Sequence, residues 1–263
     1  MTPRRDSARG AVATVSLALS LCLCAGAGTS CASAPAPWPS ATAQSWARLS
    51  AELSEQRQAQ PKAPWSAGLR ITMREPSSGR VIDGRGAIAV KPGQAVRMIL
   101  TGAAGATMLD AWVTFTRWRV AVPPLALVRR GDLVAPRDMP VGFLRWWFLA
   151  PLAGGLFAAT STREGPLWLL RYAGAVIELR EEPCPRGTLL RATRRVEGRG
   201  EAVDECRAHP APSAGDNARY VDESSGLRVD VQLESIGTEP PRDEAFEDPD
   251  APPRDPDAPG GRT

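Results

Sequence analysis

From Trp65 onward, apolar and polar residues alternate in short runs that end at turn-forming residues. Such alternation places one face of a β-strand in a core and the other face in solvent. It is clear before Pro76, where Leu69, Ile71 and Met73 are separated by polar residues. The segments Pro76–Gly79 and Lys91–Gly93 supply tight turns between successive runs. Short strands joined by tight turns predict an antiparallel meander and exclude a parallel sheet.

The predicted strands fall into two groups. The first group consists of five strands: Trp65–Arg74, Val81–Val90, Ala95–Thr101, Thr107–Thr116 and Arg117–Val122. A long connection, Pro123–Met139, leads to the second group: Leu167–Tyr172, Ala175–Arg180, Thr188–Val196 and Leu227–Ile236. Gly84 and Gly86 interrupt the second strand, where we expect a bulge or the close approach of a neighbouring backbone.

Two segments have helical patterns. Within 41–60, apolar residues recur at steps of three and four, at Trp46, Leu49 and Leu53, and Pro61 ends the pattern. We expect this stripe to pack on the sheet, because the polar face lacks the lysines of a membrane-bound helix. The segment Pro140–Pro151 predicts a short helix that is apolar almost all round, with Asp138 as its candidate N-cap.

A single strongly curved sheet satisfies this order of elements. The predicted class is mainly β (α+β), an antiparallel half-barrel over 41–236 with helices packed on its concave side. Such an arrangement leaves an apolar cavity suited to an acyl chain. Its candidate strand lining is Leu69, Ile71, Met73, Ile88, Val90, Met98, Leu100, Leu109, Val113, Phe115, Val120 and Val122, and its candidate lid is Phe143, Leu144, Trp147 and Phe148. Apolar residues at strand spacing also fill an ordinary dry core, so cavity and core remain alternatives.

The N-terminal segment has the pattern of an export signal. Three arginines precede an apolar run, Ala11–Ala27, which is followed by small residues and then by Cys31. A basic start, a short apolar stretch and a small-residue exit predict a secretory signal peptide over 1–30. A cysteine at this point predicts acylation of Cys31, with palmitate among the acyl groups. The Ala-, Ser- and Pro-rich segment 31–40 would then be a tether from the membrane.

Few residues are available for catalysis. His209 is the one histidine in the chain and lies among prolines, so a catalytic triad or a histidine zinc site would depend on a single loop residue. No G-x-S-x-G, H-E-x-x-H or P-loop motif occurs. We therefore expect a protein that is not an enzyme, with no metal and no cofactor; a hydrolase that uses carboxylates alone is a weaker alternative. The net charge of +3 and the scattered arginines predict no nucleic-acid partner.

Two cysteines, Cys184 and Cys206, lie in the predicted domain over 41–236. In an exported protein such a pair is expected to form a disulfide, and no C-x-x-C motif favours a redox or metal role. The C-terminal segment 237–263 is rich in Pro, Asp and Glu and has one aromatic residue, Phe246. Its composition predicts a disordered, solvated tail, with a recognition role as the alternative.

The segment Gly84–Gly93, followed by Val96–Leu100, resembles the second and third strands of the LolA/LolB-like lipoprotein carriers. In that family a glycine-led strand ends in a Lys/Arg-Pro turn, and the next strand carries an arginine, here Arg97, before apolar residues. The preceding helix, the Gly-rich turn and the later apolar helix occur in the same order. The resemblance therefore covers about Ser45 to Ile236.

The resemblance implies a periplasmic half-barrel that accepts the acyl chains of lipoproteins. We also expect it to have a periplasmic protein partner. The membrane-anchored member of the family is itself a lipoprotein, in agreement with Cys31. Ala32 after the cysteine implies the outer membrane by the sorting rule of enteric bacteria. The loop Gly102–Gly105 departs from the family, because it lacks the exposed leucine of the anchored carrier. The alternative is a structural or scaffold envelope lipoprotein with a filled core that binds proteins.

Overall fold

The computed structural model describes residues 42–76, 78–102, 105–196 and 199–251. The predicted signal peptide, Cys31 and the tether lie outside the described residues, as do 103–104 of the Gly102–Gly105 loop and 252–263 of the tail. No helix in the described part of the chain is long and apolar enough to cross a membrane.

The described residues form one antiparallel sheet of thirteen strands that does not close. Its order is β6-β5-β4-β3-β2-β1-β13-β12-β11-β10-β9-β8-β7, so β6 and β7 are the two edges. The bounds are β1 Trp65–Arg74, β2 Val81–Lys91, β3 Ala95–Thr101, β4 Thr107–Thr114, β5 Trp118–Val122, β6 Leu127–Gly131, β7 Gly155–Ser161, β8 Pro166–Tyr172, β9 Ala175–Cys184, β10 Gly187–Val196, β11 Arg199–Arg207, β12 Asn217–Asp222 and β13 Arg228–Ile236. The predicted fold class is confirmed.

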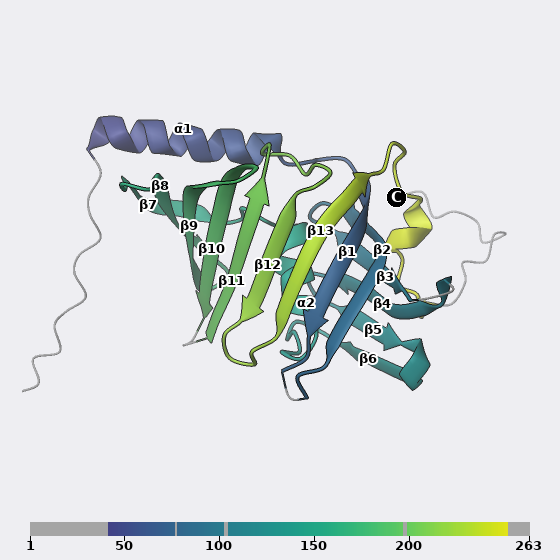
Figure 1. The fold of residues 1–263 in the computed structure, drawn as a ribbon. Helices are drawn as coiled ribbons and strands as arrows, with labels where there is room; N and C mark the ends of the chain where they lie inside the picture. Colours follow the sequence, from purple (N-terminus) through teal and green to yellow (C-terminus); the bar gives the residue numbers. More distant parts are fainter. Residues whose placement is uncertain (1–41, 77, 103–104, 197–198, 252–263) are drawn as a thin grey trace, which may run out of the picture. The chain divides into compact units, whose positions relative to one another are not determined.

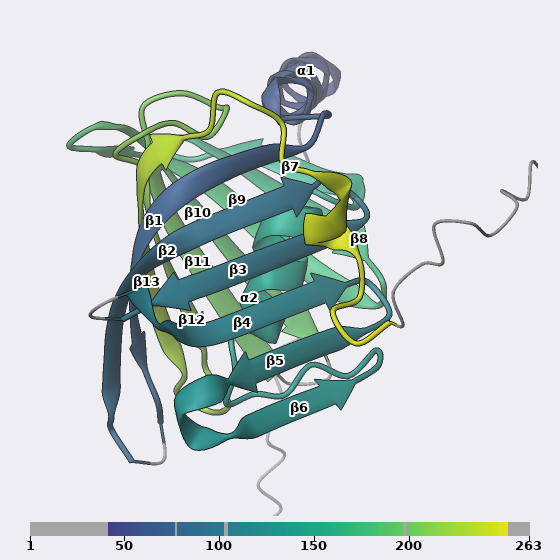
Figure 2. The same cartoon turned by 90° about the vertical axis from the view of Figure 1, so that its right-hand side faces the viewer.

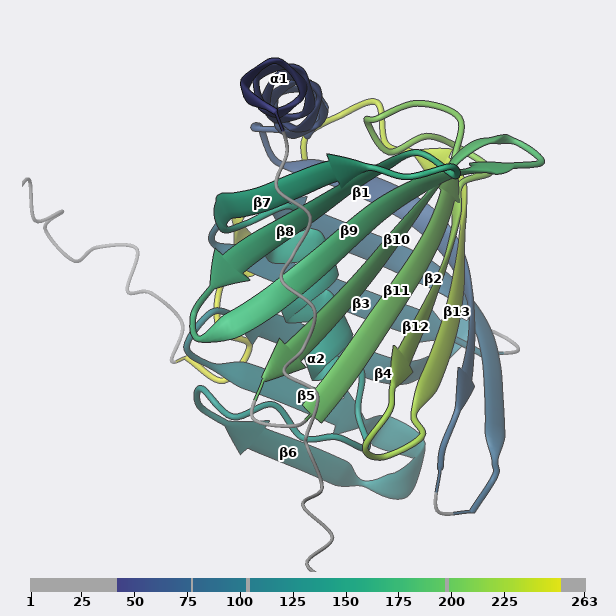
Figure 3. The same ribbon diagram turned by 90° about the vertical axis from the view of Figure 1, so that its left-hand side faces the viewer.

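The concave side of the sheet holds a short helix. The strands β1–β6 form one wall and β7–β13 the other, with α2 (Val141–Phe143) between them (Figures 2 and 3). A π-helical turn, η3 (Leu144–Leu149), continues α2, and the pair buries Val141, Phe143, Leu144, Trp146, Trp147 and Leu149. The apolar helix is therefore where the sequence predicts it. Asp138 does not cap it; this carboxylate pairs with Arg129 at 2.6 Å instead.

The N-terminal helix α1 (Ala43–Ala59) lies beside the edge strand β7 and its neighbour β8 (Figures 1 and 3). Thr42 caps it, since its Oγ1 accepts a hydrogen bond from the Ser45 amide at 3.2 Å. Leu49 and Leu53 are buried, and the indole of Trp168 on β8 donates to the Leu49 carbonyl at 2.8 Å. Trp46 is 37% exposed, so the packed stripe is narrower than predicted.

Several segments differ from the predictions. The strands β6, β7, β11 and β12 were not predicted, and Pro123–Met139 is not one connection, because it contains the 3₁₀ turn η2 (Pro123–Leu125) and β6. The tail is packed at Asp243–Phe246, where it forms a 3₁₀ turn, η4, against the outer side of the sheet (Figure 2). Phe246 is buried there and its carbonyl accepts from the Trp112 indole at 2.9 Å. The prediction of disorder is wrong for this part of the tail.

Gly86 brings β2 and β3 unusually close together. A Cβ atom at Gly86 would lie 1.9 Å from the carbonyl oxygen of Ile99, whereas a Cβ at Gly84 would lie 3.6 Å from its nearest neighbour, the carbonyl oxygen of Thr101. The predicted close approach is confirmed at Gly86. The neighbouring atoms belong to the backbone of Ile99 and Leu100, so a change of side-chain rotamer could not make room for a Cβ atom.

Candidate functional site: an apolar cavity at one end of the half-barrel

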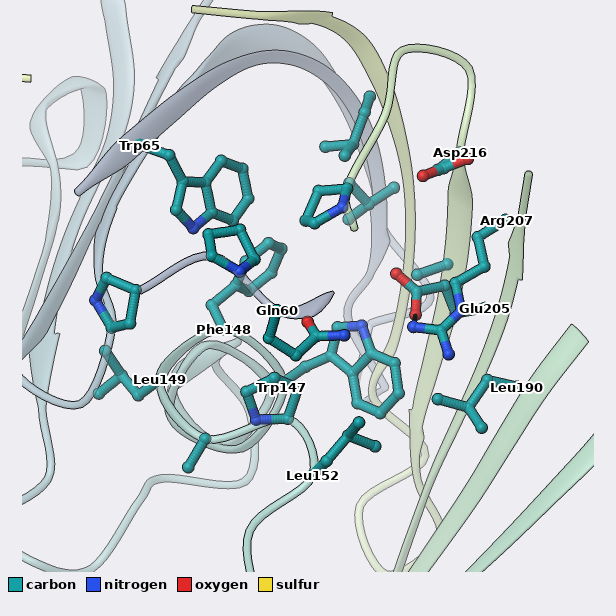
Figure 4. A pocket seen from close by; sticks show the side chains of 18 of the residues that line it. Gln60, Trp65, Trp147, Phe148, Leu149, Leu152, Leu190, Glu205, Arg207 and Asp216 are labelled. Atoms are coloured by element: carbon teal, nitrogen blue, oxygen red, sulfur yellow. Dashed lines mark ion pairs between the residues drawn. The ribbon is translucent and has the colours of Figure 1, made fainter. Parts of the chain in front are cut away.

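A cavity of about 420 Å³ opens at the end of the sheet where α1 meets β1. The C-terminal end of α1, the segment after η3 and the ends of β10–β13 surround it (Figure 4). Ligand cavities in proteins usually have volumes of roughly 300–1,000 Å³. This cavity therefore has room for part of a lipid or for a small amphiphile.

One wall of the cavity is apolar. It is formed by Trp147, Phe148 and Leu149 of η3 with Leu152 beyond it, and the facing sheet adds Leu190, Val231 and Leu233. η3 is fixed in place at its end, because the Leu149 carbonyl accepts from the Gly93 amide at 3.1 Å. Phe148 packs on Trp65 of β1, with ring centroids 6.3 Å apart. The apolar helix thus presents its last turn to the cavity and its remaining side chains to the core.

The other side of the cavity is polar. Glu205, Arg207 and Asp216 lie together there, across Trp147 from Phe148 and Leu149 (Figure 4). Arg207 Nη1 is 3.6 Å from Glu205 Oε2, and its Nη2 donates to Gln56 Oε1 at 2.7 Å. Because Gln56 belongs to α1, these contacts tie β11 to the helix that borders the opening.

Glu205 is a carboxylic acid in a nearly enclosed site, with 16% of its side chain exposed. Burial raises its pKa, and the nearby Asp216 acts in the same direction. Arg207 and a hydrogen bond from the Trp147 indole act in the opposite direction and do not offset the burial. Trp147 therefore borders both sides of the cavity, since its ring forms part of the apolar wall and its indole lies beside Glu205.

Backbone contacts and a disulfide hold this polar side in place. The Asp216 carboxylate accepts from the amides of Ala208 and Ser213 at 3.2 and 2.8 Å, which fixes the loop that carries the exposed His209. Cys206 lies between Glu205 and Arg207 and is bonded to Cys184, with a Cα–Cα distance of 6.1 Å. The predicted disulfide is confirmed, and it joins β9 to β11 across the end of β10.

Of the predicted lining residues, Trp147 and Phe148 line the cavity. The others do not: Phe115 and Val122 are half-buried, and a larger set is buried in the core: Leu69, Ile71, Met73, Ile88, Val90, Met98, Leu100, Leu109, Val113, Val120, Phe143 and Leu144. The space between the two halves of the sheet is thus filled by side chains, and the cavity lies at its end.

Sequence reasoning missed the polar residues of the cavity. Arg57 comes from α1 and Gln60 directly follows it, Glu205 and Arg207 come from β11, and Asp216 comes from the loop before β12. A signal was available on β11, because Glu205 and Arg207 follow Val203 at spacing two and occupy inward positions where apolar residues are expected. Among the described residues, no group of three or more His, Cys, Asp or Glu is placed to hold a metal ion.

No protein-family model matches the sequence. No curated protein matches it either. Solved structures do resemble the fold, among them the following two. A LolA superfamily protein from Nitrosomonas europaea has 11% identity and a TM-score of 0.51, over 76% of this chain and 97% of that one. An outer membrane lipoprotein-sorting protein domain from Vibrio parahaemolyticus has 8% identity and a TM-score of 0.44, over 76% and 94%. With its open, strongly curved antiparallel sheet and the helix on its concave side, this chain has the fold of the LolA superfamily.

Proposed function

We propose that this chain is a membrane-anchored periplasmic lipoprotein that binds a lipid, or the acyl chain of a lipoprotein, in the cavity at the end of the half-barrel. The cavity carries the proposal: about 420 Å³, with an apolar wall formed by Trp147, Phe148, Leu149 and Leu152. Such a site binds without covalent chemistry, so the chain would act as a binding protein and not as an enzyme.

The proposal includes export and anchoring. Residues 1–30 would be removed as a signal peptide, Cys31 would be acylated, and 31–40 would tether the domain to the outer membrane on its periplasmic side. There the domain would receive acyl chains from a periplasmic protein partner and would serve the localisation of outer-membrane lipoproteins. Segment 252–263 would be a solvated tail.

The apolar wall predicts a chain-length dependence. Burial of one methylene group contributes about 0.8 kcal/mol, which is roughly a fourfold change in Kd. The affinity for straight-chain amphiphiles should therefore rise about fourfold with each added methylene until the cavity is full. A shallow surface site would show a weaker dependence, because each methylene there stays partly hydrated.

The test uses the protein lacking residues 1–31. Native mass spectrometry would detect co-purifying lipid, and displacement of a fluorescent acyl probe would give Kd values for a series of chain lengths. Phe148→Glu should abolish binding, because Phe148 lines the cavity. Phe115→Glu is the matched control, since Phe115 is also half-buried but lies away from the cavity. A lipid-free protein that binds no acyl probe would refute the proposal.

One observation favours the alternative of a scaffold lipoprotein that binds proteins. The concave space between the two halves of the sheet is filled by residues such as Phe143, Leu144 and Tyr220, each at most 2% exposed. A protein of this kind would bind neither lipid nor probe in the same test. A chain-length series with a fourfold step per methylene would exclude it.

A further inference from the structure

The cavity contains a guanidinium group without an acidic partner. Arg57, near the end of α1, lines the cavity and is half-buried. Its Nε donates to the Leu152 carbonyl at 3.0 Å and its Nη2 to the Gly154 carbonyl at 2.6 Å. No carboxylate in the described part of the chain forms an ion pair with it. Because a guanidinium has five N–H donors, several donors of Arg57 remain for a ligand.

The two carboxylates of the cavity are already engaged. Glu205 interacts with Arg207 and with the Trp147 indole, and Asp216 accepts two backbone amides. Lys62, on the exposed segment after α1, adds a second cation to the lining, and within the described residues it too has no ion-pair partner. The lining beside α1 therefore holds two cations, Arg57 and Lys62, that form no ion pair with any described residue.

Charge left unpaired in a partly buried site is costly, and the lowered pKa of Arg57 reflects this burial. An anion held by the guanidinium would remove that cost and would gain charge-assisted hydrogen bonds. The carbonyl partners of Arg57 belong to the segment that also carries Leu152, next to the apolar wall. A ligand that reaches the guanidinium thus lies against Leu152 and the η3 side chains.

We infer that the cavity selects an anionic amphiphile, whose carboxylate or phosphate group binds Arg57 and Lys62 and whose hydrocarbon chain lies along Trp147, Phe148 and Leu149. This inference rests on the proposed function and narrows it, because acyl burial alone would accept neutral and anionic chains alike. Free inorganic anions lack the hydrocarbon that the apolar wall would cover, so they bind weakly.

The experiment uses the full chain, expressed with its own leader and kept in membrane vesicles of the expression host. Two photo-cross-linking probes are compared, dodecanoic acid with a diazirine in its chain and the methyl ester of the same acid. The wild-type chain should half-saturate at about a tenfold lower concentration of the acid, the factor expected for one charged hydrogen bond. Arg57→Gln should remove this preference and Arg57→Lys should retain part of it.

A second test variant and a matched control complete the set. Lys62→Gln changes an exposed side chain outside the core, and it should lower the preference for the acid a few-fold. Arg48→Gln removes an arginine of the same helix that pairs with Glu52 and does not line the cavity, and it should behave as the wild type.

Equal labelling by acid and ester in the wild type would overturn the inference and leave the proposed function standing. So would a preference that survives both Arg57→Gln and Lys62→Gln. Displacement of the acid probe by an equal concentration of inorganic phosphate would also overturn it, since the site would then bind free anions. Absence of labelling by either probe would instead count against the proposed function itself.

Discussion

Replacing Gly86 by alanine tests the packing of β2 on β3. The added Cβ would lie 1.9 Å from the Ile99 carbonyl oxygen and 2.9 Å from the Leu100 Cα, whereas separations below 3.0 Å are essentially never observed for real Cβ atoms. The two strands must therefore separate at this point. Loss of two ladder hydrogen bonds at about 1 kcal/mol each, with the strain of an overpacked site, predicts a loss of about 3 kcal/mol in the free energy of unfolding.

Gly84→Ala is the matched control, because its Cβ would make ordinary contacts at 3.6 and 3.8 Å with Thr101 and Leu100. Alanine at this strand position should change the unfolding free energy by less than about 1 kcal/mol, of either sign. Urea unfolding followed by tryptophan fluorescence measures both variants in parallel with the wild type. If the free energies of unfolding of Gly86→Ala and Gly84→Ala differ by less than about 0.5 kcal/mol, the backbone-contact argument is wrong.

Three more predictions concern the cavity and the tail. Replacing Cys184 and Cys206 by serine should lower the unfolding free energy by about 3 kcal/mol, since a loop of about 22 residues is released; urea unfolding of the oxidised wild type and of the variant compares them. Burial raises the pKa of Glu205 above its unfolded value, so the native state holds the proton more tightly and stability should fall as pH rises through that interval. Glu205→Gln should reduce this slope in unfolding curves recorded from pH 4.5 upward. Phe246→Ala should release η4 and speed hydrogen exchange at the Trp112 indole about tenfold by NMR, with little effect on global stability; unchanged exchange would mean that the tail does not protect Trp112.

The strands that the sequence predicts are those with one buried and one solvated face. β13 is an example, because Val229, Val231 and Leu233 are buried while the residues between them are not. The sequence does not predict β6 and β7, because neither has a fully alternating pattern. Both are edge strands, with a strand neighbour on one side only. β11 and β12 escape because charged residues occupy both of their faces and are balanced by cross-strand ion pairs such as Arg219–Asp230.

The candidate site was predictable only on its apolar side. Trp147 and Phe148 stand out because they belong to an apolar helix that local sequence reveals. The polar side is assembled from distant segments, since the Arg207–Gln56 contact joins residues 151 positions apart. No local pattern indicates such a pairing. The prediction of a disordered tail is wrong at Phe246 for a related reason. Phe246 is one aromatic residue in a polar segment, and its burial depends on Trp112 and Lys91 of the sheet.

The pairing of β1 with β13 sets the order in which the domain can be assembled. Every other pair of neighbouring strands is consecutive in the chain, so β1–β6 and β7–β13 are two local meanders, each built by closing short loops. The β1–β13 pairing joins Met73 to Val229 and must close a loop that spans nearly the whole domain, which makes it the slow step that we expect in folding. Trp65 on β1 and Val231 and Leu233 on β13 border the cavity. The binding site would therefore be completed last. A ligand bound there would stabilise the pairing of β1 with β13, which joins the two meanders.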